Sequence, residues 1–570
     1  MRTSIATGAL VIALFACVPG AALASSGAQA ASSSVGVGLP LTGPPSASTP
    51  PAGFSTDARQ AIKAAESNRE MLSLHAREHP LSIQVWVWAG QSWFVDFAYR
   101  GRRVAEVVES SAARVTGVWT GALAVAVYAR GDFATLFGNW WVLVPFSLMF
   151  LVPFLDLRRA WRMLHLDALV LESFLVSYLL FDHAKLEAAV WLAYLPLLYL
   201  LVRLLWLGGL RVRSRRGGGS PRAAGPAGLS PLLGVRSLAA GLVSLVLGRI
   251  VLSLVSGTVV DVGYASVIGA HRIASGQSLY YASTAHGDTY GPVAYLAYLP
   301  FELLFPWHGR WDYLPAAHAA SIVFDLVTIL GLVLLGRRLR RGREGLRLGL
   351  ALGWAWAACP FTLLALVMHT NDGLVAMLSV LSLLAFSSPA ARGALLGLAA
   401  AAKFAPAALL GLYAGQRERG VKGTLICLGS FALVILSAFA LYLPSGGLAE
   451  LYDRTIGFQL SRFDVFSPWG LHPSLDPLKA VVEVGAVVLC AIVAFGPRRR
   501  TIAQVCALAG AVTIAVQLPA EHWFYYFIVW FMPFVLVALL ASEDEDAAGA
   551  AASAPTITGA STPEPVHAGV

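Results

Sequence analysis

Asp261 is the residue whose type and position best suit acid–base chemistry. It follows the apolar run ending in Thr258-Val259-Val260, so a carboxylate stands where the chain is expected to leave the membrane. Such a carboxylate can take a proton from an attacking hydroxyl and act as a general base. The alternative is a helix cap or an ordinary interfacial charge, so catalysis by Asp261 is a hypothesis.

Asn371 and Asp372 form a second polar pair, at the expected start of another apolar segment. An acid at a helix N-terminus is ordinarily a cap, favoured by the helix dipole. An Asn beside an Asp near a pocket can instead orient a sugar hydroxyl. The sequence leaves both interpretations open, with capping the ordinary one.

Lys403 and Arg462 are the cations best placed to bind a phosphate. Lys403 lies inside the apolar segment 393–415, where a lysine is costly unless it is paired or wet. Its alternative is a lysine that snorkels to water. Arg462 lies on an expected external loop, and its planar fork of donors suits phosphate oxygens. Its alternative is an ordinary solvated arginine.

Tyr290 and His522 complete the candidate site. Tyr290-Gly291-Pro292 is typical of a turn. The apolar stretch 293–306 after it is too short to span comfortably, so we expect it along the interface. His522 precedes the last apolar segment. These polar residues gather at one face, as expected of an enzyme at that surface, whereas a transporter places polar groups near the midplane.

Long apolar segments must position these residues. The chain has 570 residues, of which 57% are hydrophobic and 13% charged, against roughly 25% charged in soluble domains. A span needs about 20 residues, and we predict eleven full spans, near 139–156, 165–182, 186–206, 233–256, 314–336, 346–366, 372–387, 423–443, 476–496, 502–518 and 523–541. The expected fold class is therefore mainly α, a polytopic transmembrane helical bundle.

Basic clusters predict the orientation, because cytoplasmic loops are rich in Lys and Arg. The clusters are Arg158-Arg159, Arg211–Arg216, Arg337–Arg347, Arg417–Lys422 and Arg498–Arg500. If residues 393–415 crossed the membrane, the fourth cluster would fall outside. A re-entrant hairpin bent at Lys403-Phe404-Ala405-Pro406 keeps it inside, since Pro406 breaks the helix and irregular backbone is tolerated where it lines a cavity.

The charge and the cysteines exclude other classes. The net charge is +9, but it lies in loop clusters, with no basic-aromatic surface typical of a nucleic-acid site. We therefore expect no nucleic acid as a partner and, besides the substrates, contact with membrane lipid; the sequence does not identify protein partners. Four of the five cysteines, Cys359, Cys427, Cys490 and Cys506, lie in or beside apolar runs without metal-ligand spacing, so we expect small buried residues rather than disulfides.

The N-terminal region differs from the rest. Residues 1–24 have the charged start, apolar stretch and Ala22-Leu23-Ala24 site of a signal peptide, and 25–53 a linker composition. Residues 54–120 predict a helix at 56–77, then strands at 83–88, 93–97, 103–108 and 114–119. This small extracytoplasmic α+β module resembles a PepSY-like domain. Its aromatic strands are more simply its own core than a ligand site.

The order of the motifs resembles a known family. The motifs are Asp261, Tyr264, Gly276–Tyr280, Tyr290-Gly291-Pro292, Asn371-Asp372, Gly397–Pro406, Arg462-Phe463, Phe466–Leu471, Tyr525-Tyr526, Trp530 and Pro533. This pattern is similar to a GT-C-fold glycosyltransferase of the glycosyltransferase 87 family of polyprenyl-phosphate-dependent mannosyltransferases. The similarity covers roughly residues 233–541, the expected GT-C-like core.

The resemblance implies inverting transfer of a sugar, mannose in many members, from a polyprenyl-phosphate donor to a glycolipid or glycan acceptor outside the cell membrane. Asp261 matches the family's catalytic aspartate. Tyr290, Asn371, Asp372, Lys403, Arg462 and His522 are then expected to bind substrate. The resemblance implies no cofactor or metal, and we see no Asp-x-Asp pair that demands one.

Three regions lie outside that core: accessory transmembrane helices at 139–206, a basic cytoplasmic linker at 207–232 and a disordered cytoplasmic tail at 542–570. His369-Thr370, which precede Asn371, fit no pattern that we can assign. The alternative functions are a transporter or flippase for a glycolipid precursor, which would need an internal repeat that we do not find, and a non-catalytic scaffold, for which eleven spans are excessive.

Overall fold

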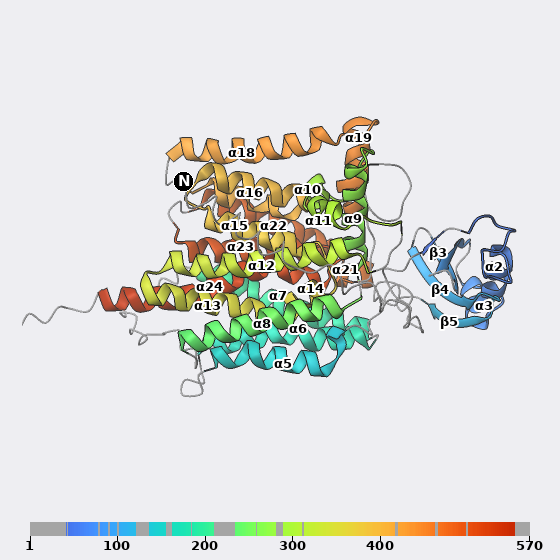
Figure 1. Ribbon diagram of the computed structural model, residues 1–570, viewed down its shortest axis with the longest axis horizontal. Coiled ribbons are helices and arrows are strands. Elements are labelled where there is room, and N and C mark those ends of the chain that lie inside the picture. Colours follow the sequence, from blue (N-terminus) through green and yellow to red (C-terminus); the bar gives the residue numbers. More distant parts are fainter. Residues whose placement is uncertain are drawn as a thin grey trace, which may run out of the picture. The chain divides into compact units, whose positions relative to one another are not determined.

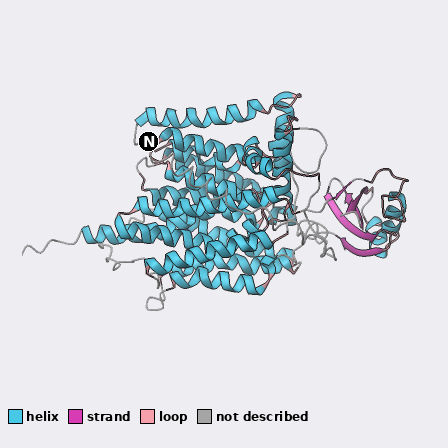
Figure 2. Ribbon diagram, viewed as in Figure 1, coloured by secondary structure: helices cyan, strands magenta, loops and turns pink. Residues whose placement is uncertain are grey.

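The computed structural model describes residues 41–42, 44–77, 80–88, 92–99, 102–120, 136–155, 162–183, 185–209, 234–257, 259–280, 289–309, 313–416, 420–461, 466–496 and 500–552. The expected signal peptide, most of the basic linker and Arg462 lie outside these residues. The strands of the described residues form one small sheet, and helices joined by loops make up the rest (Figures 1 and 2).

The N-terminal module is an antiparallel meander with two helices on one face. Its elements are β1 (Leu41–Thr42), α2 (Ala58–Glu66), α3 (Arg69–His75), β2 (Ser82–Trp88), β3 (Ser92–Tyr99), β4 (Arg102–Ser110) and β5 (Val115–Thr120). The strand order is β1-β2-β3-β4-β5. Strand β1 lies within the stretch expected to be a linker and pairs with β2.

Alternating apolar residues build the core of this module, because successive strand residues face opposite sides. Trp93, Val95 and Phe97 of β3 are fully buried together with Ala61 and Met71 of the helices. The single helix predicted over 56–77 is instead two helices. The Asn68 side chain accepts from the Glu70 amide and so starts α3, which is the ordinary role of Asn at an N-cap.

The bundle contains the remaining elements. Its helices are α5 (Trp140–Leu151), α6 (Met163–Asp182), α7 (Leu186–Leu207), α8 (Val235–Val255), α9 (Asp261–Ala274), α10 (Pro292–Leu296), α11 (Leu299–Leu304), α12 (Pro315–Leu339), α13 (Gly342–Ala358), α14 (Pro360–Val367), α15 (Asp372–Leu384), α16 (Pro389–Ala402), α17 (Leu410–Ala414), α18 (Gly420–Leu441), α19 (Gly447–Tyr452), α20 (Phe458–Ser461), α21 (Pro468–Leu471), α22 (Asp476–Phe495), α23 (Ile502–Gln517) and α24 (Ile528–Ala552).

Shorter helical turns join several of these helices. They are η1 (Leu136–Gly138), η2 (Val152–Phe154), η4 (Ala405–Leu409), the π-helical turn η5 (Asp453–Gly457), η6 (Pro473–Leu475) and η7 (Tyr525–Phe527). Helix α24 extends beyond the predicted end of the last span, into the segment expected to be a disordered tail.

Six helices among the described residues are long and apolar enough to cross a membrane, or seven if the bent pair α13–α14 counts as one span. The six are α6, α7, α8, α12, α18 and Pro473–Phe495. Each of the other five predicted spans coincides with the bent pair or with a shorter apolar helix. The predicted multi-pass bundle with a small N-terminal α+β module is confirmed.

A buried ion pair holds the break between α13 and α14, which meet at 59° before Pro360. Arg249 of α8 donates through Nε and Nη2 to Asp325 of α12 at 2.9 and 2.7 Å. Its Nη1 donates to the Ala357 carbonyl at 2.9 Å and its Nη2 to that of Thr362 at 3.1 Å. Because the carbonyls at the end of α13 lack helical partners, this arginine supplies a donor to the Ala357 carbonyl and also ties α14 to the pair through Thr362.

The predicted hairpin at 393–415 is present. Helix α16 ends at Ala402, Lys403 is extended (φ −139°), and η4 begins beyond it with Pro406 near its start. The two open ends of the hairpin lie beside each other, because Arg392 Nη2 donates to the Gln416 carbonyl at 3.2 Å. The chain therefore folds back here, and Lys403 lies at the bend.

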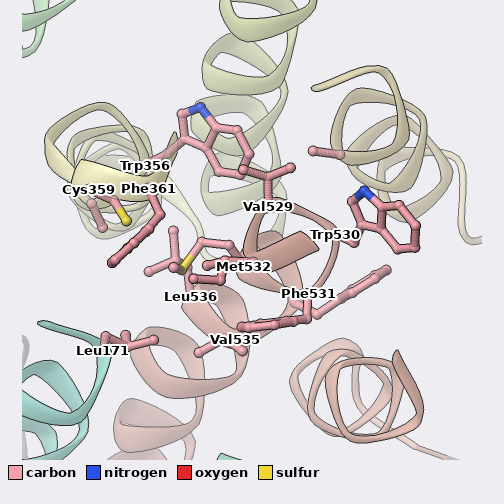
Figure 3. Close-up of a cluster of buried hydrophobic side chains, with 14 of the residues drawn as sticks. Leu171, Trp356, Cys359, Phe361, Val529, Trp530, Phe531, Met532, Val535 and Leu536 are labelled. Carbon is pink, nitrogen blue, oxygen red and sulfur yellow. The ribbon is translucent and has the colours of Figure 1, made fainter. Parts of the chain in front are cut away.

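Helix α9 crosses one end of the bundle at a steep angle to α12 and α18 (Figure 1). The first turn of α15 and the hairpin bend lie beside α9, as the contacts below show, and we call this the Asp372 end. The bundle core lies around α24, where Val529, Met532 and Val535 pack against Phe361 and Leu171 (Figure 3).

Candidate active site

A lysine–aspartate pair lies buried at the Asp372 end. Lys403 Nζ lies 2.6 Å from Asp372 Oδ1. Lys403 is 6% exposed and Asp372 1%. A buried charge is costly unless it is paired, so the burial of each charge is explained by the opposite charge of the other. Asn371, the N-cap residue of α15, makes no side-chain cap bond, and Asp372, an acid in the first turn of α15 as predicted, binds Lys403 through its carboxylate.

Two aromatic residues complete the surroundings of this pair. Trp530 of α24 donates from Nε1 to Asp372 Oδ1 at 2.8 Å. The Lys403 ammonium lies 5.4 Å from the Trp530 ring centroid and 5.1 Å from that of Tyr290, within cation–π range. Tyr290 is brought there by Gly291, where a Cβ would lie 2.0 Å from the Ala401 carbonyl oxygen. Only glycine permits this approach of backbone to backbone.

Asn371 joins α15 to α9. Its Nδ2 donates to Ser266 Oγ at 3.0 Å, and both residues are buried. Ser266 in turn donates to the Val262 carbonyl at 2.8 Å. The amide of Asn371 therefore holds the first turns of α9 beside the Asp372–Lys403 pair.

Asp261 is the first residue of α9 and is half-buried. Its Oδ1 accepts from the Val262 amide at 2.8 Å. The preceding Val260 amide donates to the Met368 carbonyl at 3.1 Å, which fixes Asp261 beside the segment that ends in Asp372. The first turns of α9 and α15, which carry Asp261 and Asp372, are therefore held at the same end of the bundle, and the cation there is bound to Asp372.

His522 lies at the edge of the site and Arg462 outside the described residues. The His522 ring contacts Phe466 at 5.7 Å and Phe527 at 5.9 Å between centroids. Phe527 stacks on Trp530 at 4.6 Å, so His522 is two aromatic rings away from Asp372.

Sequence reasoning missed two residues of this site as site residues: Trp530 and Ser266. Trp530 was part of the motif pattern, but nothing local marks an indole in an apolar helix as the partner of a distant acid. Ser266 stands in an unremarkable helical stretch. Among the described residues, no three His, Cys, Asp or Glu side chains are grouped so that they could hold a metal.

Comparison with known proteins matches the second half of the chain to one family. Residues 289–542 match the model of Glycosyltransferase family 87. This segment contains every predicted site residue except Asp261, which precedes it. The comparison with curated proteins gives no match.

The comparison with solved structures gives a low-level similarity. The similar structure is described as ArnT from Cupriavidus metallidurans bound to undecaprenyl phosphate, with 18% identity and a TM-score of 0.39, covering 53% of this chain and 59% of that chain. This chain therefore spans less than two-thirds of the length of that protein, and a TM-score this low supports no argument about the site.

The family match confirms, over residues 289–542, the resemblance expected from the motifs. The matched family is one of glycosyltransferases, the predicted enzyme class.

Proposed function

We propose that this glycosyltransferase 87-like protein moves a sugar, mannose being the first to test, from a polyprenyl-phosphate donor to a lipid or glycan acceptor. The observation that carries the proposal is the buried Asp372–Lys403 pair, which the hydrogen bond of Asn371 to Ser266 ties to the helix that begins with Asp261. A carboxylate for the acceptor and a cation for the leaving group are the two functions that such a transfer needs.

Lys403 is the proposed phosphate-binding residue. An ammonium has three donors, and among the described residues only Asp372 accepts from this one. The remaining donors can bind the oxygens of a lipid phosphate, whose negative charge grows as its bond to the sugar breaks. A cation fixed in a site that excludes water stabilises this charge far better than one in water.

Asp261 is the proposed base. The acceptor hydroxyl oxygen attacks the anomeric carbon, its proton passes to the Asp261 carboxylate, and the lipid phosphate leaves with the electron pair of the broken bond. Because the attack is opposite to the leaving group, the configuration inverts. Asp261 suits this role because it is half-buried and open to a hydroxyl, whereas Asp372 is neutralised by Lys403.

The other predicted residues have proposed roles around this centre. Tyr290 stacks beneath Lys403 and limits its movement, and Asn371 holds α9 in place rather than reaching a sugar. Arg462 is proposed as a second phosphate-binding cation and His522 as a contact for the acceptor.

The Asp372 end is proposed to face outward. Basic residues gather at the opposite end of the helices: Arg338 donates to the Leu384 carbonyl at the end of α15, and Arg340 to the Ala541 carbonyl in α24 at 3.2 Å. Cytoplasmic ends of spans carry such clusters, so the site would open on the extracytoplasmic side, with the C-terminus in the cytoplasm.

The test uses purified full-length protein in lipid nanodiscs, with polyprenyl-phosphate mannose and a membrane glycolipid extract. We expect an acceptor that gains the mass of one hexose. The substitution Asp261→Asn should abolish this gain while the protein still inserts. The matched control is Asp476→Asn, an exposed acid at the start of α22, which should retain activity.

Two outcomes would contradict the proposal. Transfer by Asp261→Asn at the wild-type rate would remove the assigned base. Movement of the donor lipid across proteoliposomes without any bond formed would favour the transporter alternative.

A further inference from the structure

His369 has an uncommon backbone conformation. Its φ is +52°, in the left-handed region, which few residues with a Cβ adopt, although Asn, Asp and His do so more often than the others. Its side chain is fully buried. A histidine held in this conformation, two residues before Asn371, costs stability, and such outliers concentrate at functional sites.

Contacts from two other helices hold the His369 ring. Its Nε2 lies 3.0 Å from Ser253 Oγ and 3.2 Å from the Ser253 carbonyl oxygen, at the end of α8. The ring stacks on His318 of α12, with 3.6 Å between centroids. His318 is itself anchored, because its Nε2 lies 2.9 Å from the Ser256 carbonyl oxygen. The ring thus fixes the turn at 368–371 to α8 and α12.

The backbone of this turn touches the helix that carries Asp261. The Met368 carbonyl accepts from the Val260 amide at 3.1 Å. The His369 carbonyl oxygen lies so close to Gly263 that a Cβ there would be 2.2 Å away. The left-handed conformation of His369 directs this carbonyl toward α9, so the turn is the spacer between Asp261 and Asp372.

We propose that His369, stacked on His318, is a positioning residue that sets the distance between the Asp261 and Asp372 carboxylates. It does not touch substrate; it holds the turn against α9. The role in transfer rests on the proposed function, whereas the role in holding the turn does not. Small displacements of a reacting group lower rates steeply, by about a hundredfold for about 1 Å.

The test replaces the ring and keeps the backbone free to turn. His369→Gly removes the ring and the backbone strain together, and His369→Asn keeps a residue that tolerates this conformation. His318→Gln removes the stacking partner from another helix, so the inference stays testable if the position-369 variants fail to fold. The matched control is His165→Asn, a buried histidine of α6.

Two measurements on full-length protein in nanodiscs decide the matter. Hydrogen–deuterium exchange should rise in peptides covering 256–264 and 366–374 of His369→Gly and His318→Gln. With polyprenyl-phosphate mannose as donor, kcat per folded protein should fall about tenfold to a hundredfold, with KM for the donor within about threefold because Lys403 remains. His369→Asn should be intermediate, and His165→Asn unchanged.

Unchanged exchange in both peptides would overturn the inference, as would an equal fall in kcat for His165→Asn. If wild-type protein transfers no sugar, the proposed function fails, but the exchange data still decide whether His369 holds the turn.

Discussion

In two ion pairs of the described bundle both partners are buried, Arg249–Asp325 and Lys403–Asp372, and each aspartate also accepts from a tryptophan: Asp325 from Trp356 and Asp372 from Trp530. Both tryptophans border the same apolar cluster around α24 (Figure 3). In the first pair, Arg249 makes five hydrogen bonds, two to Asp325 and three to the segment 357–362.

In the second pair, Lys403 makes one hydrogen bond to the described residues, and both donors to Asp372 share a single oxygen, Oδ1. Arginine suits a saturated structural role because its donors have fixed directions, whereas lysine keeps a mobile point charge with donors to spare. This difference indicates which pair can still bind a ligand. We call the Arg249–Asp325 pair the closed pair, because its donors are engaged, and the Lys403–Asp372 pair the half-used pair, because Lys403 has donors left.

The largest expected effect is on the closed pair. Asp325→Leu leaves Arg249 buried without its partner, and breaking such a pair costs about 3–5 kcal/mol. We expect a strongly lowered Tm and poor yield of monodisperse protein. Adding Arg249→Met should recover much of the loss, because no charge is then buried alone. An unchanged Tm for the single variant would show that the pair is not structural.

Substitution of Lys403 in the half-used pair should lower enzymatic activity more than it lowers thermal stability. We expect Lys403→Met to lower the transfer rate about a hundredfold or more, with a smaller fall in Tm than Asp325→Leu. The control is Lys422→Met, an exposed lysine of α18, measured by the same transfer assay and thermal melt. Equal losses of stability for Lys403→Met and Asp325→Leu would end the distinction between the pairs.

Substitution of either tryptophan should have a smaller effect, on the transfer rate for Trp530 and on stability for Trp356. Trp530→Phe removes one of two donors to Asp372 and should lower kcat about tenfold, which corresponds to roughly 1.4 kcal/mol. Trp356→Phe removes the matching donor from Asp325 and should cost about 1 kcal/mol of stability with kcat unchanged. A fall in kcat for Trp356→Phe together with an unchanged kcat for Trp530→Phe would contradict the distinction between the two pairs.

The smallest effect concerns a buried acid of the module, Glu109 of β4, which has no partner for either carboxylate oxygen among the described residues. Burial raises its pKa from 4.5 to about 7. In the unfolded chain the group ionises near 4.5, so the stability that the neutral acid contributes is complete below that pH. It is lost as the pH rises through about 7.

Glu109→Gln should therefore protect the β4 amides more than wild type at pH 8 and about equally at pH 5. The measurement is hydrogen exchange, corrected for the intrinsic rate at each pH. Equal protection of wild type and variant at both pH values would show that Glu109 is not a buried acid, and would weaken the rule that an unpaired acid is held neutral.

Much of the fold could be predicted from local pattern alone. Six of the predicted spans are long apolar helices because hydropathy follows directly from composition. The hairpin was predicted from charge parity, since a crossing would have moved Arg417–Lys422 to the wrong side, and the return of Gln416 to Arg392 confirms that the chain folds back. The strands of the module followed from alternation.

The candidate site was only partly accessible from the sequence. Lys403 was singled out because a lysine in an apolar segment needs a partner, but the partner expected was a phosphate, not Asp372. The role of Asp372 was left open between a cap and a ligand, because an acid at a helix start is ordinarily a cap. The left-handed His369 and its stack on His318 had no sequence signal.

The sequence by itself determined that this chain spans a membrane, where it folds back, and which charged residues stand in costly places. Only the tertiary structure decided which charges meet. Hydropathy and helix breaking are sums over neighbours along the chain, whereas the pairing of Asp372 with Lys403, Trp530 and the turn at His369 depends on how separate helices pack. The energy of that packing is stored in contacts between residues far apart in sequence, which no local pattern records.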